Sequence, residues 1–445
     1  MTAPASSPPR EASIPTNRFA LADFAPLATF AVIVVVFGLL ATNFFSFSTV
    51  SLTLKRGAVL AIVSTGLTFV MLCAEIDLSV GTMALLAACV CGVLWEQPFG
   101  AKARQAQAAR LTALREVNSA TSRRDAAVKE RDEATAKRSQ ENQDLEKLDA
   151  IIARANEAIV TADEVIARQR PLTAVTGVEV RTTFCVIAVP FLVALGLGVV
   201  SGSLTVSSGL PSFIITLAMM NIAIGLSKFL TLSQKYEVPQ FLKNLGNAPL
   251  FKWRVPLFPK LGTLEVPQSA ALAVIVMVAA HLVLQHTRFG RYVYMTGGNR
   301  QAARLAGVRT ERIVIACLMI CAATAAFGGM VNAGRLGAVS LDQNSDLLLE
   351  AVACVVLGGT SLFGGEGGIG RTVLGVLTFT VLRVGLEDTN PERLIRFSWL
   401  PEAWKQDLVK MSWVTSFDLL RPFLLGIVLL LALVLHGRMV KHRHE

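Results

Sequence analysis

The chain has 445 residues, of which 53% are hydrophobic and 17% are charged. A soluble protein of this length carries about a quarter charged residues, so the composition excludes an ordinary soluble enzyme and favours a chain solvated by lipid. The formal net charge of +10 does not require a nucleic-acid partner, and we expect none. In a membrane protein, such an excess arises from basic loops on the cytoplasmic side.

The chain begins with a stretch rich in Pro, Ser and Thr, and we expect a disordered cytoplasmic tail over residues 1–21 rather than a signal peptide. Beyond it, about ten segments have membrane or near-membrane length. Several have only 15–17 residues, shorter than the roughly 20 that a helix needs to cross a bilayer. Because Gly and Ser surround them, we predict broken or re-entrant helices. The segments are Ala22–Phe45, Gly57–Cys73, Val80–Trp95, Phe184–Val206, Ser212–Leu232, Ala270–Gln285, Ile313–Ala333, Leu348–Leu362, Thr372–Leu386 and Leu419–Leu435.

The first break, Ala74–Gly81, carries two acidic side chains, Glu75 and Asp77, between apolar segments. Acidic residues at membrane depth are costly and are candidates for function. They are compatible with an ion-coupling site or with a lining of the substrate path. In a third interpretation, Asp77 or Ser79 caps the helix that follows.

Residues 99–182 form an insert unlike the rest of the chain. Its central part, 101–170, contains neither Gly nor Pro, and apolar residues recur every seven positions at Leu145, Ile152, Ile159 and Ile166. The flanking spans enter and leave on one side of the membrane, so the insert has to return on itself. We predict a coiled-coil-like helical hairpin that turns near Ser139–Gln143 on the periplasmic side.

The second half, 183–437, contains a basic loop over residues 287–312. Its six arginines, with the basic tail 438–445, predict cytoplasmic N- and C-termini. Lys55, Arg56 and Arg335 fall on the wrong side in this scheme. Within the loop, a turn at Gly297–Asn299 and a short helix ended by Gly307 favour contact with a groove on a partner protein.

A second acidic break lies between Glu350 and the Gly358-Gly-Thr-Ser361 stretch, as expected for a repeat-built transporter. Directly after it, Gly365–Thr372 nearly matches a nucleotide-binding loop, but Arg371 replaces the Lys that would reach the phosphates. We therefore predict a turn between spans, no ATP site, no metal site, no cofactor and no catalytic residue in this chain.

Four stretches together resemble the ribose/xylose-type permeases of bacterial ABC monosaccharide importers: Glu75–Gly81, Pro211–Leu217, Phe289–Gly307 and Leu357–Gly365. They occur in that family's order, and the sequence Ala-Glu-Ile-Asp resembles its xylose branch. The resemblance implies an all-α inner-membrane protein of about ten transmembrane helices with the vitamin B12-importer-type fold. It also implies a homodimer, a separate cytoplasmic ATPase that binds ATP and Mg²⁺, and a periplasmic sugar-binding protein.

The resemblance further implies two sets of site residues. Residues expected along the substrate path are Glu75, Asp77, Ser79, Gly81, Asn221, Glu350, Gly358, Gly359, Thr360 and Ser361. Residues expected in the loop that couples to the ATPase are Gly290, Arg291, Gly297, Gly298, Asn299, Ala302, Ala303, Leu305 and Gly307.

The chain departs from the family pattern at Leu348-Leu-Glu350, where many members have Glu-Leu-Asp, and after Arg335-Leu336, where the usual Pro and Gly are missing. The sugar therefore stays open, and a nucleoside or sugar alcohol is an alternative solute. Two other functions also stay open. One is a secondary transporter coupled to H⁺ or Na⁺ through Glu75 and Asp77. The other is a membrane scaffold that recruits partners through the hairpin.

Overall fold

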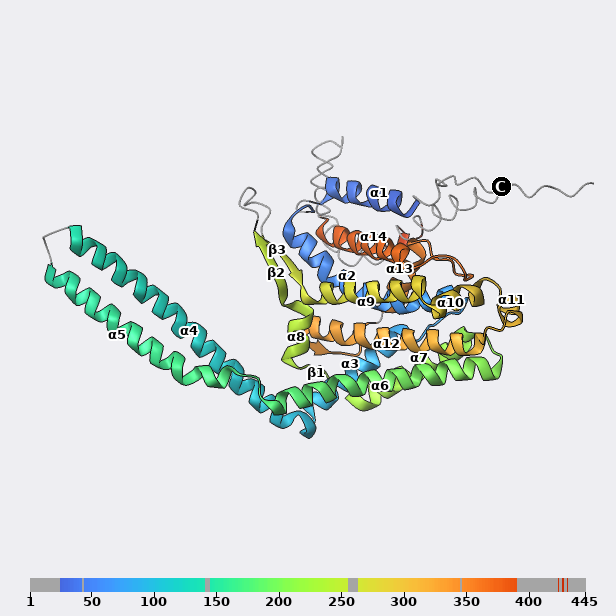
Figure 1. The fold of residues 1–445 in the computed structure, drawn as a ribbon, viewed down its shortest axis with the longest axis horizontal. Coiled ribbons are helices and arrows are strands. Elements are labelled where there is room, and N and C mark those ends of the chain that lie inside the picture. Colours follow the sequence, from blue (N-terminus) through green and yellow to red (C-terminus); the bar gives the residue numbers. More distant parts are fainter. Residues whose placement is uncertain are drawn as a thin grey trace, which may run out of the picture.

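The computed structural model describes residues 25–41, 44–140, 145–254, 263–344 and 346–389, and four residues near the C-terminus (423, 426, 427 and 430). Within these ranges it is a helical bundle with one long projecting arm (Figure 1). The helices are α1 (Ala25–Leu40), α2 (Phe47–Leu72), α3 (Val80–Glu96), α4 (Pro98–Gln140), α5 (Leu145–Gln169), η2 (Arg170–Thr173), α6 (Gly177–Ser208), α7 (Ser212–Thr231), α8 (Gln240–Asn247), α9 (Gln268–His286), α10 (Arg288–Gly298), α11 (Arg300–Leu305), α12 (Thr310–Leu336), α13 (Leu347–Leu357) and α14 (Ile369–Asp388).

Six helices are long and apolar enough to cross a membrane: α2, α6, α7, α9, α12 and α14. A seventh span is counted if α3 and the start of α4, which are bent by 75° relative to each other, are taken together. The apolar helices α1 and α13 are shorter. Within the described residues, length and composition thus support six to seven spans, where the sequence predicts nine. The tenth predicted segment, Leu419–Leu435, lies almost entirely outside the described residues.

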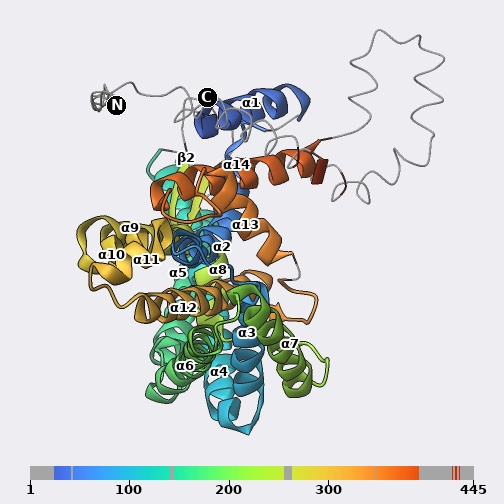
Figure 2. The same cartoon turned by 90° about the vertical axis from the view of Figure 1, so that its right-hand side faces the viewer.

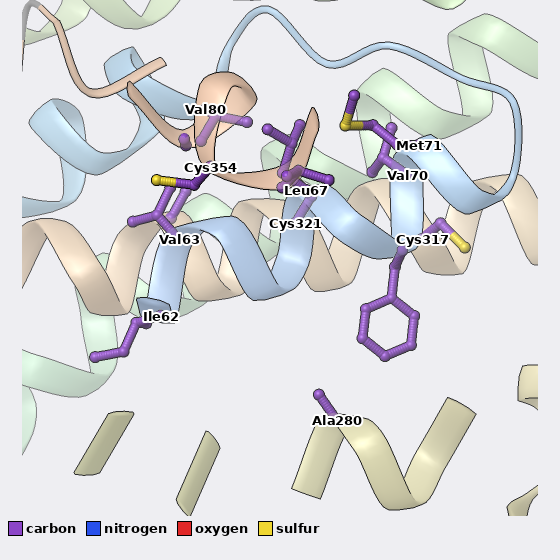
Figure 3. Close-up of a cluster of buried hydrophobic side chains, with 14 of the residues drawn as sticks. Ile62, Val63, Leu67, Val70, Met71, Val80, Ala280, Cys317, Cys321 and Cys354 are labelled. Carbon is purple, nitrogen blue, oxygen red and sulfur yellow. The ribbon is translucent and has the colours of Figure 1, made fainter. Parts of the chain in front are cut away.

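The centre of the bundle is the contact between α2 and α12. Every residue of α2 from Ala58 to Leu72 is buried, and the neighbouring side chains come from α3, α9, α12 and α13 (Figure 3). Gly328 on α12 permits this contact, because a Cβ there would lie 2.4 Å from Val63 Cγ2. Cys317, Cys321 and Cys354 pack in this core as small apolar residues.

The insert is a pair of helices, α4 and α5, that lie side by side and project away from the bundle (Figure 1). Alanines line the face between them: Ala113, Ala120, Ala127 and Ala134 on α4, and Ala155 and Ala162 on α5, are all buried. The base of the arm is fastened to α6 by an ion pair of Arg110 with Glu179, whose nitrogen and oxygen lie 2.7 Å apart. The partly buried α5 residues Ile152, Ile159 and Ile166 belong to the predicted heptad series.

The expectation of an all-α chain is wrong in detail, because two short antiparallel pairs of strands are present. In one, β1 (Tyr236–Glu237) pairs with β4 (Ala338–Val339). In the other, β2 (Pro249–Arg254) pairs with β3 (Thr263–Pro267), and the Lys252 ammonium lies 3.0 Å from the Glu265 carboxylate. This hydrogen-bonded ion pair lowers the pKa of Glu265. The strands join loops at the end of the bundle from which the arm projects.

The remaining architecture gives the bundle two distinct ends. The helices α10 and α11 form one end, which faces the viewer in Figure 2. The other end carries α8, the strands and the arm. Helix α12 runs between the two ends over 27 residues, about 40 Å.

Candidate functional site

The backbone between α2 and α3 is not helical, and its polar groups are satisfied by the start of α7. Ser212 Oγ accepts a hydrogen bond from Ile76 N at 2.9 Å, and Thr216 Oγ1 accepts one from Leu78 N at 3.1 Å. A broken helix inside a membrane needs such partners, because lipid supplies none. This explains why the Pro211–Leu217 stretch carries hydroxyl residues in an otherwise apolar helix.

Glu75, in this break, reaches the loop at the α10–α11 end of the molecule. Its carboxylate is buried, with 7% of its surface exposed, and it forms an ion pair with Arg300 on α11. Helix α11 is itself held by its N-cap residue, since Asn299 Oδ1 accepts from Ala302 N at 2.9 Å. The Arg300–Glu75 ion pair therefore connects α11 directly to the broken segment between α2 and α3.

Two glycine-containing segments, the end of α10 and the α13–α14 turn, meet the end of α2 at this end of the bundle with backbone close to backbone. Gly365 N donates to Leu72 O, the last residue of α2, at 2.9 Å. A Cβ on Gly297 would lie 1.8 Å from the same Leu72 oxygen, and a Cβ on Gly365 would lie 2.8 Å from Gly298 Cα. We call these contacts the glycine junction. Because backbone packs on backbone here, the end of α2, the end of α10 and the α13–α14 turn are held as one unit.

The turn between α13 and α14 is also tied to α10 through a tyrosine. Tyr294 Oη donates to Gly367 O at 3.1 Å. Burial raises the pKa of the Tyr294 hydroxyl, which keeps the proton needed for this hydrogen bond. The predicted path residues Gly358, Gly359, Thr360 and Ser361 belong to this turn. The structure thus places them beside the coupling loop, at the end of α13 remote from Glu350.

The surface of this end exposes two large apolar side chains. Leu305, on α11, has 90% of its surface exposed, and Phe363, in the α13–α14 turn, has 89% exposed. Of the other predicted coupling residues, Arg291, Gly298, Asn299, Ala302 and Gly307 are also exposed. Ala303 is 2% exposed and packs inward, and Gly290 lies against Leu284, so neither forms part of the surface. Sequence analysis missed Phe363, whose only signal is an apolar residue inside a Gly-rich turn.

A polar cavity of about 350 Å³ lies where the opposite halves of α2, α12, α13 and α14 come together. Three arginines line it, one from each of three helices: Arg56 on α2, Arg335 on α12 and Arg383 on α14. Polar partners come from the same helices and from the α12–α13 loop. They are Asn332, Asp342, Gln343, Asn344, Asp346, Glu350 and Thr380.

Ion pairs connect most of these charges across the cavity wall. Arg383 pairs with Glu350 and, at 3.6 Å, with Glu387, and Glu387 also pairs with Arg56. Glu350 is 9% exposed, so its charge is held by this chain of ion pairs rather than by water. Arg56 and Arg335 were exceptions to the prediction that basic residues lie on the cytoplasmic side. Their positions in the cavity explain these exceptions.

The remaining predicted path residues have different surroundings. Gly81, at the start of α3, touches the cavity wall, because a Cβ there would lie 3.2 Å from Asn344 O and 3.3 Å from Leu348 N. Asp77 is buried and accepts from Ser79 N at 2.8 Å and Ser79 Oγ at 2.6 Å. Ser79, the N-cap residue of α3, makes no capping hydrogen bond through its side chain, and Asp77 bonds to Ser79 itself. Asn221 is exposed on α7 and bonds to its own helix, through Leu217 O.

The structure therefore brings the predicted residues into two groups instead of one path. Glu75 joins the coupling loop, while Glu350 and Gly81 belong to the cavity. The sequence identified only Glu350 and Gly81 among the residues around the cavity, and Arg56 and Arg335 were visible only as exceptions in the charge pattern. Asn332, Asn344 and Arg383 lie on different elements and share no local motif, so only the packing of α12, α13 and α14 reveals them.

Multiple apolar helices, a polar cavity between them and a protruding loop at one end define the class of protein, a multi-pass membrane permease. Comparison with known proteins gives the family. Residues 49–433 match the family model described as "Branched-chain amino acid transport system / permease component", and the chain belongs to this permease family. No solved structure matches the chain.

The curated relatives are transport permeases. The ribose import permease protein RbsC of Escherichia coli is 35% identical over 215 residues, which cover 48% of this chain and 64% of the relative. The fructose import permease protein FrcC of Rhizobium meliloti is 32% identical over 197 residues, covering 44% and 54%. The autoinducer 2 import system permease protein LsrC of Yersinia enterocolitica is 31% identical over 249 residues, covering 56% and 59%. The chain thus matches less than two thirds of the length of these relatives.

Proposed function

We propose that this chain is the translocating subunit of an ATP-driven importer that moves a monosaccharide, ribose-like or xylose-like, into the bacterial cytoplasm. Two copies would enclose the path, a separate cytoplasmic ATPase would bind ATP and Mg²⁺, and a periplasmic binding protein would deliver the sugar. Family membership supports this proposal, as do the relatives, which are named as import permeases for ribose, galactose and fructose.

The main structural support for the proposal is the exposed apolar surface at the α10–α11 end. Exposed apolar residues surrounded by polar ones mark a surface that contacts another protein. Here Leu305 is exposed on the loop 287–312, whose six arginines are the charge expected on the cytoplasmic side, and Phe363 is exposed in the neighbouring α13–α14 turn. This surface is the proposed docking site of the ATPase. The cavity end and the arm would then face the periplasm.

The contacts between this surface and the membrane helices would allow a conformational change of the ATPase to move those helices. Closure of the ATPase would displace α11, and the Arg300–Glu75 ion pair and the glycine junction would carry the displacement to α2, α3 and α13. The half-helix α13 runs from the junction to the cavity, so the same movement reaches Glu350. Alternating access then requires only that the nucleotide state changes which packing of these helices is populated.

The test is purification of the tagged chain from its native membrane in mild detergent, followed by mass spectrometry of the bound proteins. We expect an ATPase subunit with the wild type and its loss with Gly298→Trp. A Cβ at Gly298 meets no atom within 4 Å, so the bulky side chain enters open space and the fold is retained. Gly225→Trp is the matched control, because that position on α7 is equally open.

A complex that lacks an ATPase, or one that keeps it in the Gly298→Trp variant, would contradict the proposal. Transport would then be measured with a protonophore present and ATP held constant. Loss of uptake under those conditions would favour an ion-coupled carrier.

A further inference from the structure

The hairpin of β2 and β3 exposes an apolar surface that neither the cavity nor the coupling loop uses. Leu250, Phe251 and Trp253, all on strand β2, have 63%, 54% and 53% of their surfaces exposed. Phe251 and Trp253 share one face of the strand, because successive side chains alternate between the two faces. Lys252 lies on the other face, where its ammonium is 3.0 Å from the Glu265 carboxylate. The hairpin therefore has a charged face and an aromatic face, and the aromatic face is half-exposed.

The hairpin lies at the depth where two membrane spans begin, at the end of the bundle from which the arm projects (Figure 1). Strand β3 leads into α9 without a linker, because Pro267 is both its last residue and the N-cap residue of α9. The same strand contacts the first turns of α2, where Ser51 Oγ accepts a hydrogen bond from Glu265 N at 2.9 Å. Helices α2 and α9 are both long and apolar enough to cross a membrane. Because such spans begin where the hydrocarbon core meets the headgroups, the hairpin lies at that boundary.

Neither water nor hydrocarbon alone suits this hairpin. In water, the three large apolar side chains of β2 would be exposed close together, which is unfavourable. In hydrocarbon, the outer edge of β2 would be unfavourable, because among the described strands β2 pairs with β3 alone and lipid chains offer its backbone no hydrogen bonds. The headgroup region satisfies both requirements, since water, phosphate and ester oxygens bond to the backbone while the first part of the acyl chains contacts the aromatic rings. Tryptophan is enriched at this depth in membrane proteins.

We propose that the β2–β3 hairpin is a lipid-binding element, and that the Phe251 and Trp253 rings insert between phospholipid headgroups at the arm end of the bundle. Lys252, whose side chain is 59% exposed, places its ammonium at the level of the phosphates. Phospholipid is favoured over a protein partner because β3 runs directly into α9, a span whose exposed side chains, such as Ile275 and Val278, are apolar. Lipid contact of the hairpin fixes the depth at which α2 and α9 enter the bilayer. This role goes beyond the proposed import function and does not rest on it.

The experiment is depth-dependent quenching of tryptophan fluorescence, measured on the full chain in lipid nanodiscs. The quencher is phosphatidylcholine that carries bromine either near the headgroup end or near the methyl end of its acyl chains. The Trp253 signal is the difference between the wild type and Trp253→Phe, a variant that keeps an aromatic ring on β2. We expect this signal to lose more intensity to the bromines near the headgroups than to those near the methyl ends. Iodide in the water should quench it less than it quenches free tryptophan.

Val278→Trp, introduced into the Trp253→Phe background, is the matched control for depth. Val278 is 52% exposed and lies on the helix that directly follows the hairpin. At the rise of an α-helix, it is about 16 Å further along α9 than Pro267. The tryptophan introduced there should show the opposite order, with the larger loss of intensity to the bromines near the methyl ends.

Three results would overturn the proposal. Quenching of Trp253 by iodide but not by brominated lipid would leave the hairpin as a surface in water, where another protein could dock. Insensitivity to both quenchers would mean that a second copy of the chain covers the hairpin. The same depth order for Trp253 as for the Val278→Trp control would place the hairpin in hydrocarbon. None of these results depends on whether an ATPase is retained, so lipid contact and the import function can fail separately.

Discussion

The two ends of the bundle are built by opposite means. At the α10–α11 end, the parts are joined by backbone packed against backbone at Gly297 and Gly365. At the cavity end, they are joined by long side chains, with Arg56, Arg383 and Glu350 reaching across open space. Backbone contacts allow almost no adjustment, whereas arginines and carboxylates can exchange partners. The first end is therefore suited to transmitting a displacement, and the second to releasing and rebinding a polar solute.

The largest effect is expected from a side chain placed inside the glycine junction. Gly297→Val puts a Cβ 1.8 Å from Leu72 O, and because backbone cannot move aside cheaply, the strain should cost about 3 kcal/mol of stability. Thermal unfolding of the purified protein in detergent measures this loss. Gly298→Val, one residue further on and facing open space, should unfold near the wild-type temperature. Similar melting of both variants would mean that the junction adjusts more than its contacts suggest.

A smaller effect is expected at the cavity end. Arg383→Met leaves the buried carboxylate of Glu350 without its partner, which should cost about 2 kcal/mol, since Arg383 is itself 38% exposed and partly screened. The double variant Glu350→Leu/Arg383→Met should recover more than half of this loss, because both charges are removed together. Chemical denaturation in detergent would quantify the cycle.

The control for this comparison is an ion pair at the surface. Lys243 pairs with Glu237, which is 70% exposed, and Lys243→Met should change the stability by less than about 0.5 kcal/mol. An Arg383→Met variant as stable as Lys243→Met would show that the cavity ion pairs contribute to neither stability nor organisation.

The contrast between the ends also explains how much the sequence could predict. The glycine junction was predictable in outline, since glycines and a broken helix leave a local pattern at Gly297-Gly298 and Gly358–Gly365. The positions of glycines in the sequence do not show which segments are in contact. The turn that begins at Gly358 was therefore predicted to line the substrate path, whereas in the structure it lies beside α10. Ala303 shows the same limit, because a helix of six residues does not reveal which of its faces is buried.

Apart from Glu350 and Gly81, the residues around the cavity could not be predicted from the sequence. Its arginines are 327 residues apart at the extreme, from Arg56 to Arg383, and each stands in an apolar helix where it looks like an isolated exception. Their grouping depends on how α2, α12 and α14 cross. The break between α2 and α3 could be predicted in part. Its acidic residues mark it as a candidate for function in the sequence, but only the tertiary structure shows that Glu75 pairs with Arg300 on α11.

The arm shows what a periodic pattern can and cannot reveal. On α5, Ile152, Ile159 and Ile166 of the heptad series are half-buried, whereas Leu145, the first residue of the series, is 41% exposed. On α4, the buried series consists of small residues, Ala113, Ala120, Ala127 and Ala134. Alanine is easily overlooked as a core residue, yet its small size is what lets two helices approach closely.

The smallest effect is therefore expected from the ion pairs of the arm. Arg124 Nε lies 2.7 Å from Asp163 Oδ1, but both side chains are about half exposed, and such pairs contribute only about 0.5 kcal/mol. Arg124→Ala should leave hydrogen exchange in α4 and α5 within about threefold of the wild type, and Arg123→Ala should have no effect. A much faster exchange in Arg124→Ala would mean that charges, and not the alanine face, hold the arm together. The arm would then lose its shape at high ionic strength, whereas the glycine junction, which contains no charge, would not respond to salt.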